Sequence, residues 1–149
     1  AIGDIKEKYL KDGINEYLKR LSRFADIKIY ELKEHNPTST NSNDINQALQ
    51  KDAIEIKKRI KGLVVCLTLE GQSMDSIDFA KFIEKSSLKT SEITFIIGAS
   101  NGLSDEIKSM STNKISFSKM TFPHQLMRLI LLEQLYRAFT IINNISYHK

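Results

Sequence analysis

Glu92-Ile-Thr-Phe-Ile-Ile-Gly-Ala-Ser-Asn-Gly102 is the stretch that decides the expected fold. Its first part, Ile93–Ile97, is rich in β-branched and aromatic residues and predicts a short buried strand. The strand runs into Gly98 and Gly102, where the chain can turn sharply or bring bare backbone close to a ligand. The stretch therefore predicts a strand that ends in a ligand-binding loop.

Two more predicted strands end in loops of the same kind. Lys114–Phe117 is followed by the small-residue loop Ser118–Thr121. Leu63–Leu69 is apolar throughout, which is typical of a strand buried on both faces of a parallel sheet, and it ends in a predicted turn at Glu70-Gly71. We expect the three strand ends to converge on one edge, which is the usual ligand site of an α/β sheet.

Helices are predicted between these strands, over Ile5–Phe24, Asp44–Lys61 and Met74–Leu88. Asp44 is the expected N-cap of the second helix, with Gln47 completing a capping box, and Asp75 or Ser76 is expected to begin the third. Asp26–Leu32 is predicted to be a short additional strand.

The alternation of strands and helices predicts an α/β fold, a mostly parallel sheet with helices on both faces. The length of 149 residues predicts one domain over 1–149. Ala1-Ile-Gly3 has the character of a strand end entering a loop. The first strand of the sheet is therefore expected to lie upstream of this sequence.

The last predicted helix begins near Pro123, a favourable first helical position, and runs to Ile142. Its apolar residues cover almost the whole circumference, and its main polar positions are Arg128, Glu133, Gln134 and Arg137. A helix that is apolar all round is buried on more than one side. One side can face its own sheet and the other a second copy of the chain, so a homodimer is expected. The alternative is a central core helix of a monomer.

Composition and charge narrow the function classes. Charged residues make up 27% and hydrophobic residues 41%, which is ordinary for a soluble globular protein. The net charge of +4 resides entirely in residues 114–149, beside the predicted ligand loops. Such a distribution suits a polyanionic partner such as RNA, although a solvated basic surface without a partner is the alternative.

The remaining sequence features concern the compartment. No apolar run is long enough to span a membrane without charges, and no signal peptide is evident. The single cysteine, Cys66, excludes an internal disulfide. These features predict a cytoplasmic chain.

Standard catalytic and cofactor motifs are absent. The loop 98–102 is neither a Walker A loop nor a Gly-x-Gly-x-x-Gly dinucleotide turn, and Ser100 lacks the Gly-x-Ser-x-Gly context of a serine hydrolase. His35, His124, His148 and Cys66 form no familiar metal-ligand spacing, so no metal is expected. From the residues alone, the chain is a ligand-binding α/β domain, dimeric and basic near its ligand.

Longer motifs add a family resemblance. Phe95–Leu103, Ser116–Arg128, Glu133–Ala138 and the terminal Tyr147-His148-Lys149 carry it. These segments closely resemble the RlmH (YbeA-like) family, ribosomal RNA large-subunit pseudouridine N3-methyltransferases of the SPOUT class. With Ala1–Gly3, Ile5–Tyr9 and Leu67–Gly71, the resemblance covers essentially the whole chain. This sequence has Gly98-Ala99 where the family often has Gly-Gly.

The resemblance implies a C-terminal trefoil knot, a homodimer and bound S-adenosyl-L-methionine; the general rule against knotted chains argues the other way. The implied cofactor-binding residues are Leu67, Gly98, Phe117, Ser118, Lys119, Met120, Thr121 and Phe122. Their types suit this role, because adenine needs backbone donors and acceptors above an apolar floor. For the apolar residues among them, an ordinary place in the core is the alternative.

The implied reaction methylates N3 of pseudouridine 1915 in 23S ribosomal RNA of the assembled ribosome. His148 and Tyr147 are the candidate bases for the N3 proton, with a frayed, functionless terminus as the alternative. Arg128 and Arg137 are candidates for RNA phosphates, or they brace the dimer, and Arg137 is also placed to pair with Glu133. The competing functions are a non-catalytic ribosome-binding protein with the same fold and, less well supported, a flavodoxin-like nucleotide-binding protein.

Overall fold

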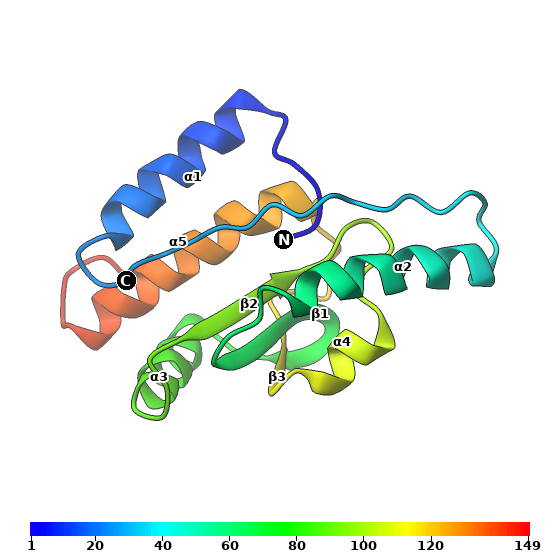
Figure 1. Ribbon diagram of the computed structural model, residues 1–149. Helices are drawn as coiled ribbons and strands as arrows, with labels where there is room; N and C mark the ends of the chain where they lie inside the picture. The colour runs from blue at the N-terminus through cyan, green and yellow to red at the C-terminus, as the bar shows by residue number, and fades with distance from the viewer.

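A three-stranded parallel sheet forms the centre of the chain in a computed structural model that describes residues 1–149. Its strands β1 (Leu63–Ser73), β2 (Ile93–Ile97) and β3 (Asn113–Ser116) lie in the order β2-β1-β3 (Figure 1). Consecutive residues 64–66 of the central strand β1 are all buried, as expected for a strand covered on both faces. The α/β class and the parallel sheet are confirmed.

Helices cover both faces of this sheet. The helices α1 (Lys8–Leu21), α3 (Ser76–Ser87) and α5 (His124–Ile142) share one hydrophobic core with Val65 of β1. The helices α2 (Ser42–Lys57) and α4 (Asp105–Met110) share a second core with Val64 and Cys66. Neighbouring side chains of β1 thus pack into opposite cores, because successive side chains of a strand point to opposite faces of the sheet.

The strand β1 continues beyond the turn predicted at Glu70-Gly71. Leu67 and Gln72 both pair with Ile115, so the register shifts between them at a bulge. A Cβ on Gly71 would lie 2.5 Å from the carbonyl carbon of Ile115. The predicted turn is therefore wrong. The chain bulges instead, and glycine permits this close contact of two backbones.

A short extended segment lies next to β2. The N–H of Ile2 donates to the carbonyl of Ile97 at 3.0 Å, and Ile2 forms an isolated parallel bridge with Leu32. The strand predicted at Asp26–Leu32 is wrong, since this one bridge is its only pairing. Around this bridge the N–H of Leu32 donates to the carbonyl of Ala1 at 2.9 Å, and the carbonyl of Leu32 accepts from the N–H of Gly3 at 2.7 Å.

The helix ends follow local capping. Asp75 is the N-cap of α3, as predicted, and its side chain accepts from the N–H of Asp78. The predicted cap of α2 is wrong: the helix begins at Ser42, and Asn41 is the cap, accepting from the N–H of Asp44 at 2.8 Å. Asparagine and aspartate are about equally good N-caps, so residue type alone does not favour Asp44 over Asn41.

The helix α5 lies between α1 and α3 and against the sheet (Figure 1). Leu131, Leu132 and Leu135 are buried there. Pro123 is its N-cap and His124 its first residue, one position later than predicted. No helix of the structure has the length and apolar character needed to cross a membrane. No group of three or more His, Cys, Asp or Glu side chains is arranged to hold a metal ion.

Candidate functional site

The carboxyl ends of β2 and β3 meet on either side of Leu67 of β1, as the sequence predicts, whereas β1 itself continues through its bulge to Ser73. Leu67 of β1 lies between Ile97 of β2 and Ile115 of β3, and it pairs with both. Gly98 follows Ile97 directly, and Phe117 is the first residue after β3. Residues from three distant parts of the chain are thereby adjacent at the edge where α/β sheets usually bind ligands.

The loop after β2 is folded tightly on itself. The N–H of Gly102 donates to the carbonyl of Ala99 at 2.9 Å, and Gly102 has a φ of 78°. A Cβ on Gly98 would lie 2.4 Å from the carbonyl oxygen of Gly102. Gly98 is therefore required by the close approach of the loop's own backbone, and any side chain at this position would open the loop.

The loop 117–122 after β3 presents free backbone groups. None of its N–H groups donates to a backbone carbonyl. The Ser118 hydroxyl accepts from the N–H of Met120 at 2.9 Å, and the carbonyl of Ser118 accepts from the Ser116 hydroxyl at 2.9 Å. The middle residues 119–121 are exposed. Unpaired donors and acceptors of this kind are suited to hydrogen-bond a heterocyclic ligand.

Two of the predicted cofactor residues also belong to the core. The ring of Phe117 packs edge-on against Phe79 of α3, with ring centroids 5.6 Å apart. Leu67 is half-buried against the same core. Both therefore provide apolar side chains next to the strand-end loops. Both residues are only partly buried, so a place in the core is compatible with contact to a ligand.

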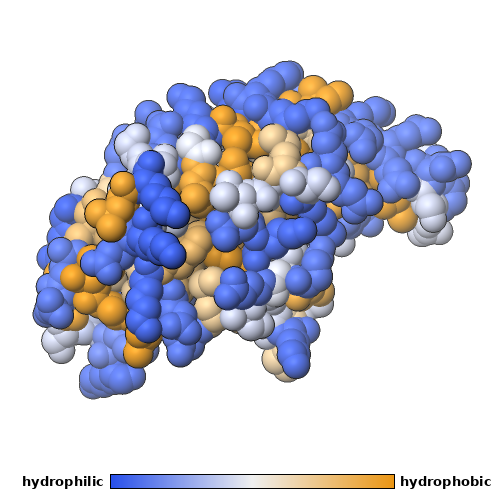
Figure 2. Space-filling view, turned by 90° about the horizontal axis from the view of Figure 1, so that it is seen from below, coloured by the Kyte–Doolittle hydropathy of each residue, from blue (hydrophilic) through white to orange (hydrophobic).

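Hydrophobic side chains also reach the surface. Figure 2 shows apolar patches scattered among hydrophilic side chains on the face seen from below. Large exposed side chains of this type include Leu88 and Met120, the latter 72% exposed in the loop 117–122. Scattered apolar residues are ordinary on protein surfaces. Met120 differs because it stands in a predicted binding loop.

The predicted catalytic tail is not hydrogen-bonded to these loops. The Tyr147 hydroxyl donates to Glu133 Oε1 at 3.1 Å and lies 3.3 Å from the Tyr17 hydroxyl. These contacts lie along the second half of α5, whereas the loop 117–122 precedes its first residue, His124 (Figure 1). From His124 to Glu133 the helix rises roughly 14 Å. Within one chain, the tail is therefore not hydrogen-bonded to the predicted cofactor loops.

The surroundings of Tyr147 decide what it can do. Burial raises the pKa of this phenol well above its ordinary value, and the hydrogen bonds with Tyr17 and Glu133 raise the pKa further. Tyr147 therefore stays protonated near neutral pH and donates a hydrogen bond rather than accepting a proton. Its ring also packs on the Arg137 guanidinium, 4.8 Å from the ring centroid.

Arg137 connects the tail to α5. Its Nε donates to Glu133 Oε1 at 3.0 Å, which confirms the pairing predicted for these two residues. Its Nη1 lies 3.2 Å from His148 Nδ1. Because arginine can only donate, Nδ1 is the acceptor of this hydrogen bond. The ion pair with Glu133 raises the pKa of Arg137, which keeps it charged.

Arg128 is not placed as an RNA contact. The side chain is 3% exposed, and its Nη2 donates to the carbonyls of Ile2 at 2.8 Å and Gly3 at 2.6 Å. Its Nη1 donates to Glu31 at 3.3 Å. Burial lowers the pKa of Arg128, and the carboxylate of Glu31 opposes that effect. The predicted phosphate contact of Arg128 is thus replaced by an internal one that ties α5 to the first residues of the chain.

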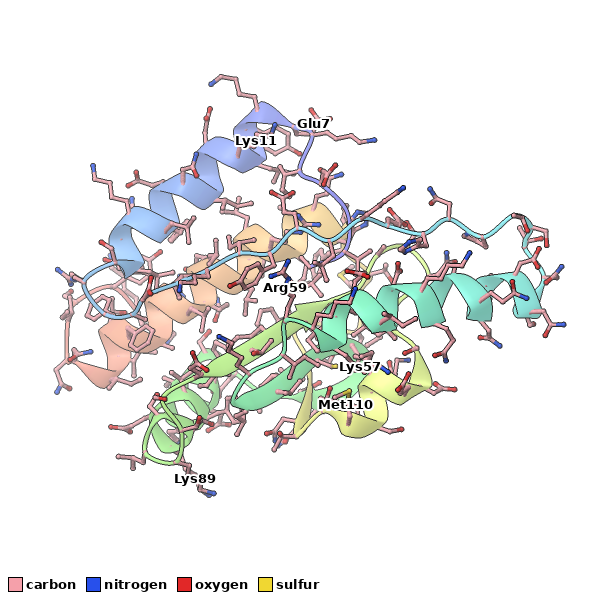
Figure 3. All side chains as sticks on the ribbon, in the orientation of Figure 1. Glu7, Lys11, Lys57, Arg59, Lys89 and Met110 are labelled. Atoms are coloured by element: carbon pink, nitrogen blue, oxygen red, sulfur yellow. The ribbon has the colours of Figure 1, made fainter.

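Replacing Arg128 with methionine is expected to lower the free energy of unfolding by about 3 kcal/mol, because two buried carbonyls lose their charged donor. Urea denaturation measures this change. The matched control is Arg59→Met. Arg59 is an exposed cation 4.9 Å from the ring centroid of Tyr30 (labelled in Figure 3), and its loss is expected to cost less than about 1 kcal/mol. Equal effects of the two substitutions would refute the structural role of Arg128.

Sequence reasoning missed two residues that organise this region. Glu31 accepts from the N–H of Ile5 at 2.9 Å in addition to Arg128, and Tyr17 meets Tyr147. Neither lies in a motif. Both contacts join residues far apart in the sequence, so no local pattern signals them.

Comparisons with known proteins show the family of this chain. A family model described as "Predicted SPOUT methyltransferase" matches residues 1–148. The "Ribosomal RNA large subunit methyltransferase H" of Fusobacterium nucleatum is 47% identical over 153 residues, covering 100% of this chain and 96% of the relative. The "Putative ribosomal RNA large subunit methyltransferase H" of Methanococcus maripaludis is 50% identical with the same coverage. The "Ribosomal RNA large subunit methyltransferase H" of Acetivibrio thermocellus is 47% identical, again with the same coverage.

Proposed function

The chain belongs to the SPOUT methyltransferase family, and we propose that it methylates N3 of pseudouridine 1915 in the 23S RNA of the assembled ribosome. The observation that carries this proposal is the meeting of Leu67, Gly98 and Phe117 at one edge of the sheet. The names of relatives that match the whole chain support a ribosomal RNA substrate. The net positive charge of residues 114–149 supports a polyanionic substrate.

The proposed methyl donor is S-adenosyl-L-methionine, which when bound supplies a reactive sulfonium methyl group. The residues at the edge fit it. The free backbone groups of the loop 117–122 would hold the adenine by hydrogen bonds, and Leu67 and Phe117 would lie beneath it as an apolar floor. Ser118, Lys119, Met120, Thr121 and Phe122 contribute to that loop through their backbone, so side-chain changes there should matter less than a change at Gly98.

A homodimer and a C-terminal trefoil knot are further parts of the proposal. Family membership supports both. The dimer has a second support in the placement of Tyr147 and His148 away from the loops of their own chain. A partner subunit would supply its tail to each cofactor edge, as a two-fold symmetric pair allows. Partly exposed apolar residues of α5, such as Ile130 and Ile141, are available for such an interface.

The chain's own residues would act mainly by alignment. Holding the target N3 in line with the methyl group lowers the barrier by roughly 7–11 kcal/mol in well-oriented systems. His148 would take up the N3 proton at Nδ1, its unprotonated ring nitrogen, after exchanging the hydrogen bond from Arg137 for the substrate. Such a role contributes about a hundredfold or more. Tyr147, kept protonated, would donate a hydrogen bond to the base, and Glu133 would fix its orientation. Arg137 is the remaining candidate for an RNA phosphate, because it is partly exposed and always charged.

The competing function is a ribosome-binding protein that does not transfer methyl groups. Methyl-labelled cofactor separates the two when the protein is incubated with ribosomes that lack the modification. An enzyme transfers label to the large-subunit RNA, whereas a binding protein sediments with ribosomes and transfers none.

Protein-free 23S RNA is expected to be methylated at least about tenfold more slowly than assembled ribosomes. A small basic surface such as this one cannot select one nucleotide by itself, so it must also read the shape of its surroundings. Initial rates of label transfer to the two substrates measure this difference. Equal rates would contradict recognition of the assembled particle.

A further inference from the structure

A groove of about 290 Å³ lies between an extended segment and the first turns of α2, outside the proposed active site. Residues 33–38 form one wall and run beside α2, as Figure 1 shows. Asp44, Gln47, Ala48 and Lys51 form the other wall. Their spacing of three and four residues places them on one face of the helix.

Side-chain contacts hold the two walls together at both ends of the groove. At one end, Asp44 accepts from the hydroxyls of Thr38 at 2.7 Å and Ser39 at 2.6 Å. At the other end, Asp52 Oδ1 accepts from the backbone N–H of His35 at 3.1 Å and lies 2.8 Å from its Nδ1. The two aspartates are roughly 12 Å apart along the helix. The groove therefore has fixed walls and is not a gap beside a loose loop.

The pairing with Asp52 orients His35 for an external ligand. Asp52 is 5% exposed, and a buried carboxylate requires a hydrogen-bond donor. Because a carboxylate only accepts, Nδ1 of His35 carries the proton. The other ring nitrogen, Nε2, has no hydrogen-bond partner within the chain, and the ring lines the groove with 30% of its side chain exposed.

The lining chemistry selects the kind of ligand. One lining residue, Ala48, is hydrophobic, so neither an apolar peptide nor the cofactor suits the groove. Lys33 and Lys51 supply positive charge, and two carboxylates, Glu34 and Asp44, balance it. Asp44 is already hydrogen-bonded to the hydroxyls of Thr38 and Ser39. The amides of Asn36 and Gln47 can both donate and accept. Cations for phosphate, together with polar groups for a base edge or a ribose hydroxyl, match a nucleotide of single-stranded RNA.

The groove is connected to the proposed active site. Glu34 lines the groove, and its carboxylate lies 3.5 Å from where a Cβ of Gly3 would be. The preceding residue, Ile2, is hydrogen-bonded to Ile97, which leads directly into Gly98. An RNA strand whose target base is held at the strand-end loops would therefore have the groove within reach of its neighbouring nucleotides.

We propose that this groove binds one nucleotide of the single-stranded RNA that flanks the methylated base. Lys33 and Lys51 contact its phosphate, and His35 Nε2 with the amides of Asn36 and Gln47 contacts its base or ribose. The inference rests on the proposed RNA methyltransferase function and adds to it a determinant of substrate affinity.

The test compares Lys51→Glu and His35→Gln with the control Lys89→Glu, which makes the same charge change just beyond α3, away from α2 (Figure 3). Both groove variants are expected to raise KM for ribosomes about tenfold, with kcat and the cofactor Kd unchanged. Lys89→Glu is expected to change KM by less than about twofold. An unchanged KM in both groove variants, an equal rise in the control, or an altered cofactor Kd would overturn the proposal.

A direct readout separates this inference from the proposed function. A photo-crosslinking amino acid at Gln47 in the full-length chain is irradiated with ribosomes. Crosslinks to large-subunit RNA support the groove even if no methyl transfer is detected, in which case the proposed function alone fails. Crosslinks only to ribosomal protein, or none while methyl transfer proceeds, overturn the groove assignment.

Discussion

Valine in place of Gly98 is expected to abolish measurable binding of S-adenosyl-L-methionine and, with it, methyl transfer. A Cβ at this position would lie 2.4 Å from the carbonyl oxygen of Gly102 and 2.7 Å from its carbonyl carbon. These are backbone atoms that cannot rotate away, so the loop must open. Because the loop forms part of the proposed cofactor site, we expect the affinity to fall by about a hundredfold or more, as calorimetric titration would measure.

Gly13→Ala is the matched control for this substitution. Its Cβ would meet only side-chain carbons of Leu129, at 3.0 and 3.2 Å, and these can shift. Alanine also favours the helix α1 by about 1 kcal/mol over glycine. Cofactor binding should therefore survive in Gly13→Ala. Normal cofactor affinity in a folded Gly98→Val variant would show that the cofactor does not use this loop.

Replacing His148 with alanine is expected to slow methyl transfer by about a hundredfold or more while leaving cofactor affinity unchanged. The imidazole is the candidate acceptor for the N3 proton, since Tyr147 beside it stays protonated. Tyr147→Phe removes the hydroxyl held by Glu133 and Tyr17 and is expected to have the smaller effect. Single-turnover rates and cofactor titrations measure the two effects separately. Full activity of His148→Ala would remove the tail from the mechanism.

Mixing the two inactive variants tests which chain supplies the tail. If each tail serves the partner's cofactor edge, a dimer of one Gly98→Val and one His148→Ala subunit contains one intact site. An equal mixture that exchanges subunits should then recover about a quarter of the normal activity. If each tail serves its own chain, every site in the mixture carries one defect, and no activity returns.

Much of the fold follows from local patterns. Apolar β-branched runs predict β1 and β2, and the run over Leu63–Leu69 indicates burial on both faces because it shows no alternation. The stretch Asp26–Leu32, in which charged and apolar residues are mixed, is also predicted to be a strand but forms only one bridge, because pairing depends on a neighbour that sequence pattern does not reveal. The bulge at Gly71 was not predicted for the same reason. It depends on the close approach of the Ile115 backbone, which lies on another strand.

The site was predictable to the same extent. The convergence of the loops 98–102 and 117–122 beside Leu67 follows from the rule that parallel strands end on one edge, although β1 itself continues past Leu67 to Ser73. The buried position of Arg128 could not be predicted in this way, because a basic residue on a predicted helix is usually exposed to solvent. Its partners lie at the other end of the chain, and only the folded structure brings them together.

The most direct test of the account locates the transferred methyl group. Ribosomes without the modification are incubated with this protein and methyl-labelled S-adenosyl-L-methionine, and fragments of the RNA are analysed by mass spectrometry. The account predicts label on N3 of one pseudouridine, at position 1915 of the 23S RNA. Label at another nucleotide would support the methyltransferase activity but contradict the proposed target position. No label, with the cofactor still bound, would contradict the enzyme itself.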